Sequence, residues 1–390
     1  MPANKGADME KTMKAIVNGK IVLPDHVEEG GCLLFDEKIH GICDRPGENV
    51  EIIDARGMYV LPGLFDIHIH GYLGEDASDG SFEGLRTMAE GVAQNGVTAF
   101  LPTTMTVSRA ELETAFGQIR RLMQESQNPD WRGARALGVN AEGPFINPKK
   151  KGAQAEENIL PGDADFFLQY PEIVQTTIAP EMPGNLACVR ALAEKGVLVS
   201  VGHTAATFEE AGAAFDAGAR HTTHLFNAMT PLAHRAPGVV GAALSDARVS
   251  CELIADTFHV HSGLFPLLRE IKGEKLILIT DCTRAGGLAD GQYTLGGQPI
   301  YVKGIECRLA DGTIAGSVLK LNQAVANMVR YGGASVWEAV NMASLNPAKL
   351  HHRDDIGALL PGRRADIVIA DADFAIHRTL LGGRTIYERG

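Results

Sequence analysis

Two histidines separated by one residue follow an apolar run near the start of the chain. Residues 61–71 read LPGLFDIHIHG. Side chains of a strand alternate between its faces, so His68 and His70 are expected to project to the same side. Gly71 is typical of a point where a strand breaks into a loop. Paired imidazoles at a strand end suit a divalent metal such as zinc or iron. The alternative is a chance pair on a half-buried strand.

Four further side chains with metal-binding or proton-transfer chemistry come at the ends of other strand-like segments. They are Glu142, His203, His224 and Asp281. Each one alone also fits an ordinary capped or solvated loop residue. Together with the histidine pair they supply four imidazoles and two carboxylates, a ligand set that suits one or two divalent metals with an open water position.

This residue set favours hydrolysis. A metal-bound water becomes hydroxide near neutral pH, and a neighbouring carboxylate can take its proton. Asp281 is the candidate for that base and for later protonating the leaving group. The chain has no GxSxG motif. Cys282, which adjoins Asp281, is a conceivable nucleophile, but no obvious base for activating a thiol flanks it, so a packing role is favoured.

Eight strand-like segments, with helical material between most of them, carry these residues. They are residues 64–70, 97–101, 136–140, 174–178, 197–201, 221–224, 251–254 and 276–280. Alternation of this kind predicts an α/β protein with a parallel sheet, and eight repeats favour a closed (β/α)8 TIM barrel. An open doubly wound sheet is the runner-up, weakened because no GxGxxG follows the first strand. The helix N-caps expected from the sequence are Ser81, Ser108 with Glu111, Asn185, and Thr207 with Glu210.

Both chain ends are rich in short β-like runs. Asn18-Gly19 is a hairpin signal between two of them. We expect residues 13–60 and 362–390 to form one discontinuous β-sandwich domain, and residues 61–361 to form the barrel. Residues 1–12 are polar and lack the apolar stretch of a signal peptide, so we expect either a disordered extension or a segment foreign to the native protein.

The composition is that of a soluble globular protein, with 45% hydrophobic residues and no run long enough to span a membrane. A net charge of −12 argues against nucleic acid or an anionic membrane surface as a partner. An anionic substrate would therefore need a local positive site. Six cysteines without a CxxC spacing favour reduced thiols and a cytoplasmic protein.

With these residues assembled, the chain resembles the amidohydrolase superfamily, and within it the N-acetylglucosamine-6-phosphate deacetylases, from about Lys14 to the end. The motifs that carry the resemblance are PGLFDIHIHG at 62–71, AEGPF at 141–145, GHT at 202–204, THLFNAM at 223–229, ITD at 279–281 and AGS at 315–317. AEGPF and THLFNAM are the ones most specific to the deacetylases. The resemblance implies a barrel with a small β-sandwich, and hydrolysis of an N-acetyl group to acetate and an amino-sugar phosphate.

The resemblance also assigns roles by position. Glu142, His203 and His224 would hold the main metal, and Asp281 would be a further ligand and the general base and acid. His68 and His70 would complete a second metal site. The residues implied to bind the phosphorylated N-acetyl amino sugar are Ala153, Gln154, Asn227, Ala228, Arg235, His259, Ala315, Gly316 and Ser317. Arg235 suits a phosphate because a guanidinium can bind two oxygens at once.

Several points stay open at the level of sequence. Many relatives have histidine where this chain has Gln154, and an amide cannot carry a charge or relay a proton. Zinc, iron, cobalt and manganese all suit the ligands, as one ion or two. A homodimer is the expectation from the family, and Arg235 could act across its interface. The rival functions are deacetylation of the galactosamine epimer, hydrolysis of a cyclic amide, and a barrel that binds without catalysis.

Overall fold

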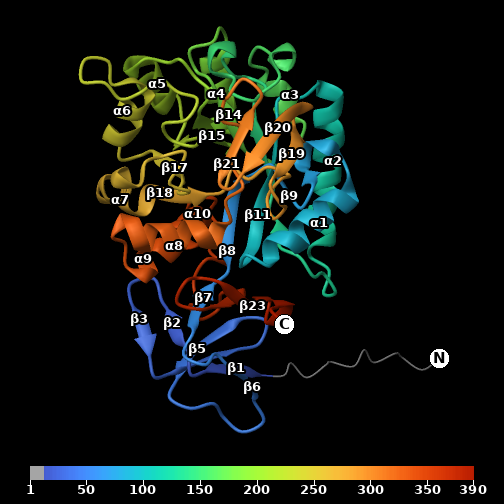
Figure 1. Ribbon diagram of the computed structural model, residues 1–390, viewed down its shortest axis with the longest axis vertical. Coiled ribbons are helices and arrows are strands. Elements are labelled where there is room, and N and C mark those ends of the chain that lie inside the picture. The colour runs from blue at the N-terminus through green and yellow to red at the C-terminus, as the bar shows by residue number, and fades with distance from the viewer. Residues whose placement is uncertain (1–12) are drawn as a thin grey trace, which may run out of the picture.

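The computed structural model describes residues 13–390, and the extension expected at residues 1–12 lies outside the described residues. Figure 1 shows two parts: a barrel surrounded by helices above, and a smaller all-β part below, which contains both blue N-terminal strands and red C-terminal ones.

Eight parallel strands form the wall of the barrel, each hydrogen-bonded to the next one along the wall. The wall closes where β18 meets β8, because the Asp281 amide donates to His68 O at 2.9 Å and Ile69 bridges Cys282. The predicted α/β barrel is confirmed. Its strands are β8 (Leu64–Ile69), β11 (Val97–Thr104), β13 (Val139–Glu142), β14 (Ile173–Ile178), β15 (Leu198–Val201), β16 (His221–Thr222), β17 (Ser250–Ile254) and β18 (Leu276–Ile279).

Amphipathic helices cover the outside of the barrel. The capping boxes predicted at Ser108 and Thr207 and the cap at Ser81 are present. No helix within residues 13–390 is long and apolar enough to cross a membrane. The helices are α1 (Phe82–Ala93), α2 (Arg109–Glu125), α3 (Ala164–Leu168), α4 (Asn185–Glu194), α5 (Phe208–Asp216), α6 (Gly238–Ser245), α7 (Phe265–Lys272), α8 (Leu321–Gly332), α9 (Val336–Met342) and α10 (Leu345–Leu350).

The prediction that Asn185 caps a helix is wrong. Gly184 occupies the N-cap of α4, and Asn185 is the first helical residue. The buried Asn185 side chain instead donates to the carbonyl oxygens of Phe145 and Ala179, both at 2.9 Å, and accepts from the Gly162 amide at 2.8 Å. The Asn185 side chain therefore bonds to residues distant in sequence instead of to the amides at the start of its own helix.

The all-β part consists of two sheets that share a core containing Phe35, Val60 and Ile367. One sheet has the order β5-β4-β1-β6, and the other has the order β24-β23-β22-β7-β2-β3. Their strands are β1 (Lys14–Val17), β2 (Lys20–Val22), β3 (Val27–Glu29), β4 (Cys32–Phe35), β5 (Ile39–Cys43), β6 (Glu51–Asp54), β7 (Tyr59–Pro62), β22 (Ile367–Ala370), β23 (Ile376–Leu381) and β24 (Arg384–Glu388). Strand β7 crosses the boundary expected at residue 60, and the domain limits stay a prediction.

Asn18-Gly19 is not the turn of a hairpin. Strand β1 pairs with β4 and β6, whereas β2 pairs with β3 and β7, so the two residues carry the chain from one sheet to the other. An alanine at Gly19 would place its Cβ 2.5 Å from Val60 Cγ2. The close approach of the Val60 side chain therefore accounts for the glycine.

Sequence analysis did not anticipate a three-stranded antiparallel sheet that follows the last barrel strand. It consists of β19 (Gly291–Leu295), β20 (Gln298–Lys303) and β21 (Glu306–Leu309). Figure 1 shows these orange strands at the barrel, on the side away from the all-β part. The remaining short strands are β9 (Gly71–Tyr72), β10 (Glu75–Asp76) and β12 (Arg135–Ala136), of which β12 pairs with the first half of β11.

A buried ion pair joins the barrel to the all-β part. Arg135 of β12 donates to Asp366, just before β22, at 2.8 Å, and both side chains are 3% exposed or less. Asp366 also accepts from the Gly382 amide at 2.8 Å. The arginine is thus held by a carboxylate that is itself fixed between strands of the other part.

We predict that Asp366→Asn lowers the free energy of unfolding by about 3–5 kcal/mol, because it leaves the Arg135 charge buried without its partner. Denaturant midpoints of wild type and variant provide the measurement. Arg86→Ala is the control, since Arg86 and Glu90 form an exposed pair on α1 and such pairs contribute about 1 kcal/mol or less. An unchanged midpoint for Asp366→Asn would contradict this account of the junction.

Candidate metal centre

Six side chains meet at the rim of the barrel where the parallel strands end. His68 is in β8 and His70 directly follows it, and Glu142 is the last residue of β13. The other three each come two residues after the end of a strand, β15, β16 and β18 in turn; they are His203, His224 and Asp281. The carboxyl ends of barrel strands lie at one face, which is why residues so distant in sequence come together.

Three of the six have left-handed backbone conformations, with φ of 46° at His203, 29° at His224 and 51° at Asp281. Such values are uncommon in residues other than glycine. Strained backbones of this kind concentrate at functional sites, where surrounding structure holds them in place. The backbone conformation of these three strand ends therefore indicates a functional site, independently of the types of the residues.

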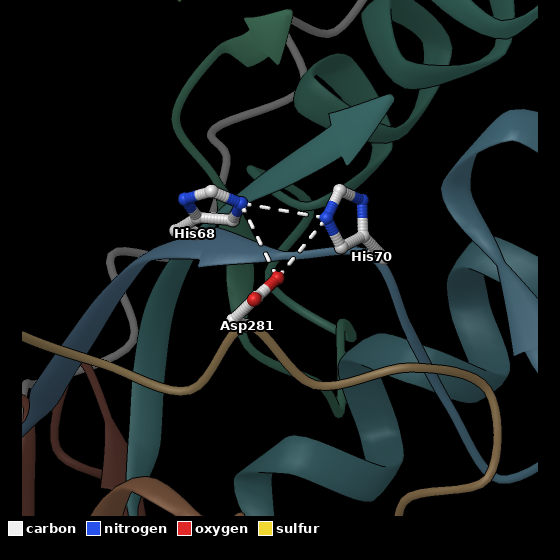
Figure 2. A group of neighbouring side chains, drawn as sticks. All are labelled: His68, His70 and Asp281. Carbon is white, nitrogen blue, oxygen red and sulfur yellow. Dashed lines mark hydrogen bonds and ion pairs between the residues drawn. The ribbon is translucent and has the colours of Figure 1, made fainter. Parts of the chain in front are cut away.

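The first group consists of His68, His70 and Asp281, and Figure 2 shows their side chains pointing toward one another. Asp281 Oδ1 lies 3.1 Å from His70 Nε2 and 3.5 Å from His68 Nε2. The two Nε2 atoms are 3.4 Å apart. All three side chains are 10% exposed or less.

The second group consists of Glu142, His203 and His224. Glu142 Oε1 lies 3.1 Å from His203 Nε2 and 3.0 Å from His224 Nε2, and the two nitrogens are 3.1 Å apart. The other carboxylate oxygen, Oε2, is 3.2 Å from His70 Nε2. Glu142 therefore belongs to the second group and also contacts His70 of the first.

The hydrogen bonds of the histidines make the cluster suitable for a metal. Nδ1 of His203 lies 2.9 Å from the carbonyl of Lys150, and Nδ1 of His70 lies 3.1 Å from that of Thr103. Carbonyl oxygens only accept, so both Nδ1 atoms carry hydrogen, and in the neutral ring this leaves a lone pair on Nε2. Metal-binding histidines are usually held in this manner. These two imidazoles thus direct nitrogen lone pairs into the cluster when they are neutral.

The electrostatics of the centre require positive charge. Burial opposes the charged form of His70, yet hydrogen bonds and charge from Asp281 and Glu142 outweigh it and raise the pKa of His70 to about 10. Burial likewise disfavours the charged form of Glu142, but His203 and His68 hold its pKa well below the usual range. A divalent cation bound by neutral histidines would supply the same compensation.

A cavity of about 400 Å³ opens onto the cluster. Six of the nine residues predicted to bind substrate line it, and the apolar side chains of Met105 and Leu295 lie in its wall. The six are Ala153, Gln154, Asn227, Ala228, His259 and Gly316. Leu295 belongs to β19, so the unanticipated sheet contributes to the cavity.

The other three predicted substrate residues do not line this cavity. Arg235 is exposed in the loop before α6. Ala315 and Ser317 are fully buried, and the Ser317 hydroxyl donates to the Thr280 carbonyl at 2.6 Å. Within one chain, therefore, Arg235 is on the surface rather than in the cavity.

Gln154 is in the cavity wall, but its amide is engaged with the protein. Its Nε2 donates to Glu142 Oε2 at 2.5 Å, and its Oε1 accepts from the Thr106 amide at 2.6 Å. Cys282 is fully buried, and burial raises the pKa of its thiol well above the usual range. This favours the packing role over a nucleophilic one for Cys282.

Glu252, a buried carboxylate beside the cluster, is not among the site residues predicted from the sequence. Glu252 lies in the middle of β17, is 0% exposed, and accepts from His68 Nδ1 at 2.9 Å. A charged residue inside an otherwise apolar strand was the available indication, because carboxylates are almost never fully buried without partners.

The Amidohydrolase family profile matches residues 59–386. The chain belongs to the amidohydrolase family. Among curated relatives, it is 38% identical to the N-acetylglucosamine-6-phosphate deacetylase of Bacillus subtilis, over 94% of this chain and 95% of the relative. It is also 38% identical to the N-acetylgalactosamine-6-phosphate deacetylase of Escherichia coli O157:H7, over 86% and 89% of the two chains.

Solved structures agree with this assignment. The N-acetylglucosamine-6-phosphate deacetylase of Pasteurella multocida superposes with a TM-score of 0.90 at 31% identity, covering 97% of this amidohydrolase and 100% of that chain. Family membership and the two histidine–carboxylate groups together indicate a hydrolase with a divalent metal site.

Metal binding should stabilise the native protein, by about 4 kcal/mol at a concentration a thousandfold above Kd. We predict that chelation of the metal lowers the melting temperature of the wild type. Glu142→Gln should bind little metal, so chelation should change its melting temperature much less. Elemental analysis and thermal melts measure the two quantities.

Glu172→Gln is the matched control for this experiment, because Glu172 is buried but pairs with Arg120 away from the centre. It should keep its metal and its response to chelation. Wild-type metal content in Glu142→Gln would remove Glu142 from the ligand set.

Proposed function

We propose that this amidohydrolase removes the N-acetyl group of N-acetyl-D-glucosamine 6-phosphate. Water and the amide give acetate and D-glucosamine 6-phosphate, a step of amino-sugar catabolism. The observation that carries the proposal is the cavity whose base is formed by Glu142, His203, His224 and Asp281, in a chain that is similar over nearly its whole length to deacetylases of this class.

In this proposal, Glu142, His203 and His224 hold the main metal, and His68 and His70 with Asp281 form a second position. When bound, a divalent metal supplies Lewis acidity, which polarises a carbonyl and makes a water more acidic. Zinc, iron, cobalt or manganese would each suit these nitrogen and oxygen ligands, as one ion or two.

Asp281 is the proposed proton carrier. Its Oδ1 faces the histidines at the base of the cavity, 3.1 Å from His70 Nε2. It takes a proton from the attacking water and delivers one to the sugar nitrogen as the carbon–nitrogen bond breaks. The acetyl group then leaves as acetate, and the carboxylate returns to its starting state.

The phosphate needs positive charge or N–H donors, since the protein as a whole carries a net charge of −12. We assign this role to Asn227, Ala228, Arg235 and His259. His259 Nδ1 lies 2.6 Å from Asp256 Oδ2 and donates to it, which leaves Nε2 available to the cavity that His259 lines. Arg235 is exposed in its own chain, and we propose that it completes the site of the second subunit in a homodimer. The protein is proposed to be cytoplasmic.

Two other substrates compete with N-acetylglucosamine 6-phosphate: its galactosamine epimer and a cyclic amide. The first rival is the galactosamine epimer. It is supported by the N-acetylgalactosamine-6-phosphate deacetylase of Escherichia coli O157:H7, which is as similar to this chain as the Bacillus subtilis enzyme is, at 38% identity. Cyclic-amide hydrolases such as dihydroorotase often have a metal-bridging lysine, whereas the corresponding residue here is Glu142. The second rival is therefore the weaker.

We predict that purified protein of measured metal content releases acetate fastest from N-acetylglucosamine 6-phosphate. The same sugar without phosphate should react much more slowly, and Arg235→Ala should raise KM for the phosphorylated sugar. N-acetylgalactosamine 6-phosphate and dihydroorotate complete the panel. Preference for the galactosamine phosphate would replace the proposed substrate, and no turnover of any phosphorylated sugar by metal-loaded protein would overturn the function.

Replacement of the proton carrier should separate chemistry from metal binding. We predict that Asp281→Asn lowers kcat at least about 100-fold, the usual range for loss of a general acid–base group. Metal should stay bound at the Glu142 group, which does not include Asp281. Steady-state kinetics with elemental analysis test this, and near-normal turnover would exclude the assigned role.

A further inference from the structure

Four hydrogen bonds from three segments of the barrel converge on Glu252. It lies in β17, below the cluster, and its side chain is fully buried. Oε2 accepts from the His68 ring and from the His224 amide, and Oε1 accepts from His221 and Gln175. The four distances are 2.9 Å from His68 Nδ1, 2.9 Å from His224 N, 3.0 Å from His221 Nε2 and 3.0 Å from Gln175 Nε2.

Two of these donors belong to proposed metal ligands, one in each group. The bond to His68 Nδ1 fixes a hydrogen on that nitrogen, so that Nε2, which faces Glu142 and Asp281, is the nitrogen left to bind a metal. The bond to the His224 amide holds a residue whose backbone φ is 29°, an uncommon conformation for a histidine. One carboxylate thus sets the ring orientation of one ligand and the backbone of another.

We propose that Glu252 is a positioning residue of the metal centre, which orients His68 through its ring and His224 through its backbone and thereby sets the affinity for the metal. This inference rests on the proposed metal site and is independent of the substrate.

The chemistry of the site argues against a role in packing alone. A fully buried carboxylate is expensive compared with an apolar residue of similar volume, so packing does not call for one. Burial raises the pKa of Glu252, but His68 and His221 more than compensate, and the net effect is a pKa below the usual range. Two N–H donors reach each of its oxygens, so the carboxylate accepts at both.

Glutamine is the informative substitution, because it keeps the shape and replaces one acceptor by an NH2 group. Either orientation of the amide places donors against donors. If the NH2 group faces His68, the ring can accept at Nδ1 only by moving its hydrogen to Nε2, which removes the lone pair that would bind a metal. If it faces the other way, His221 and Gln175 must rearrange.

The test compares wild type, Glu252→Gln and Glu172→Gln. Metal-free protein is titrated with Co²⁺, and both affinity and the visible spectrum of the bound ion are recorded. We expect Glu252→Gln to bind Co²⁺ about 10- to 100-fold more weakly, the usual effect of losing an outer-shell partner, with an altered spectrum. Glu172→Gln should match wild type in both respects.

The outcomes are distinguishable. Wild-type affinity and spectrum in a folded Glu252→Gln would overturn the positioning role, even if the variant melts at a lower temperature. Failure of wild type itself to bind Co²⁺ would overturn the proposed metal site instead. If Glu252→Gln does not fold, Gln175→Leu removes one of the four donors and keeps the carboxylate. Weaker Co²⁺ binding in that variant would support the role, and unchanged binding would contradict it.

Discussion

The structure depends on how two buried carboxylates and four imidazoles share one small space at the rim of the barrel. Glu142 and Asp281 contact the same histidines, and ionised carboxylates taken out of water need compensating positive charge. Protons on the histidines supply it in the metal-free chain, and a bound cation would supply it otherwise. The cluster is therefore polar, buried and charged, which suits hydrolytic chemistry and does not suit a packing core.

Everything around the cluster keeps these groups in place. Parallel strands bring six residues to one rim, left-handed turns aim three of them inward, and Glu252 fixes two from below. The all-β part is attached at the opposite end of the barrel, where Arg135 meets Asp366. Residues that hold the two parts together and residues proposed to act on substrate thus lie at different ends of the barrel, as is usual for this fold.

The sequence predicted the barrel strands and brought six polar side chains to their ends, because both depend on local patterns: strand-length segments, most of them apolar, that end in a polar residue. The roles of these side chains stay a prediction. The sequence could not predict features decided by long-range contacts. Asn185 bonds to distant carbonyls instead of capping its helix, and Asn18-Gly19 joins two sheets instead of turning a hairpin. Glu252 meets His68 across 184 residues of sequence, and Gln154 meets Glu142 only because the loop between them folds back.

The most direct test of the central claim is to locate the metal. Crystals of the purified protein, soaked in Zn²⁺, can be measured by anomalous diffraction at the zinc edge. The account predicts a peak within about 2.0–2.2 Å of Glu142 and of Nε2 of both His203 and His224, the usual distance for such ligands. Metal-saturated crystals without a peak at this position, or with a peak away from these three side chains, would contradict it.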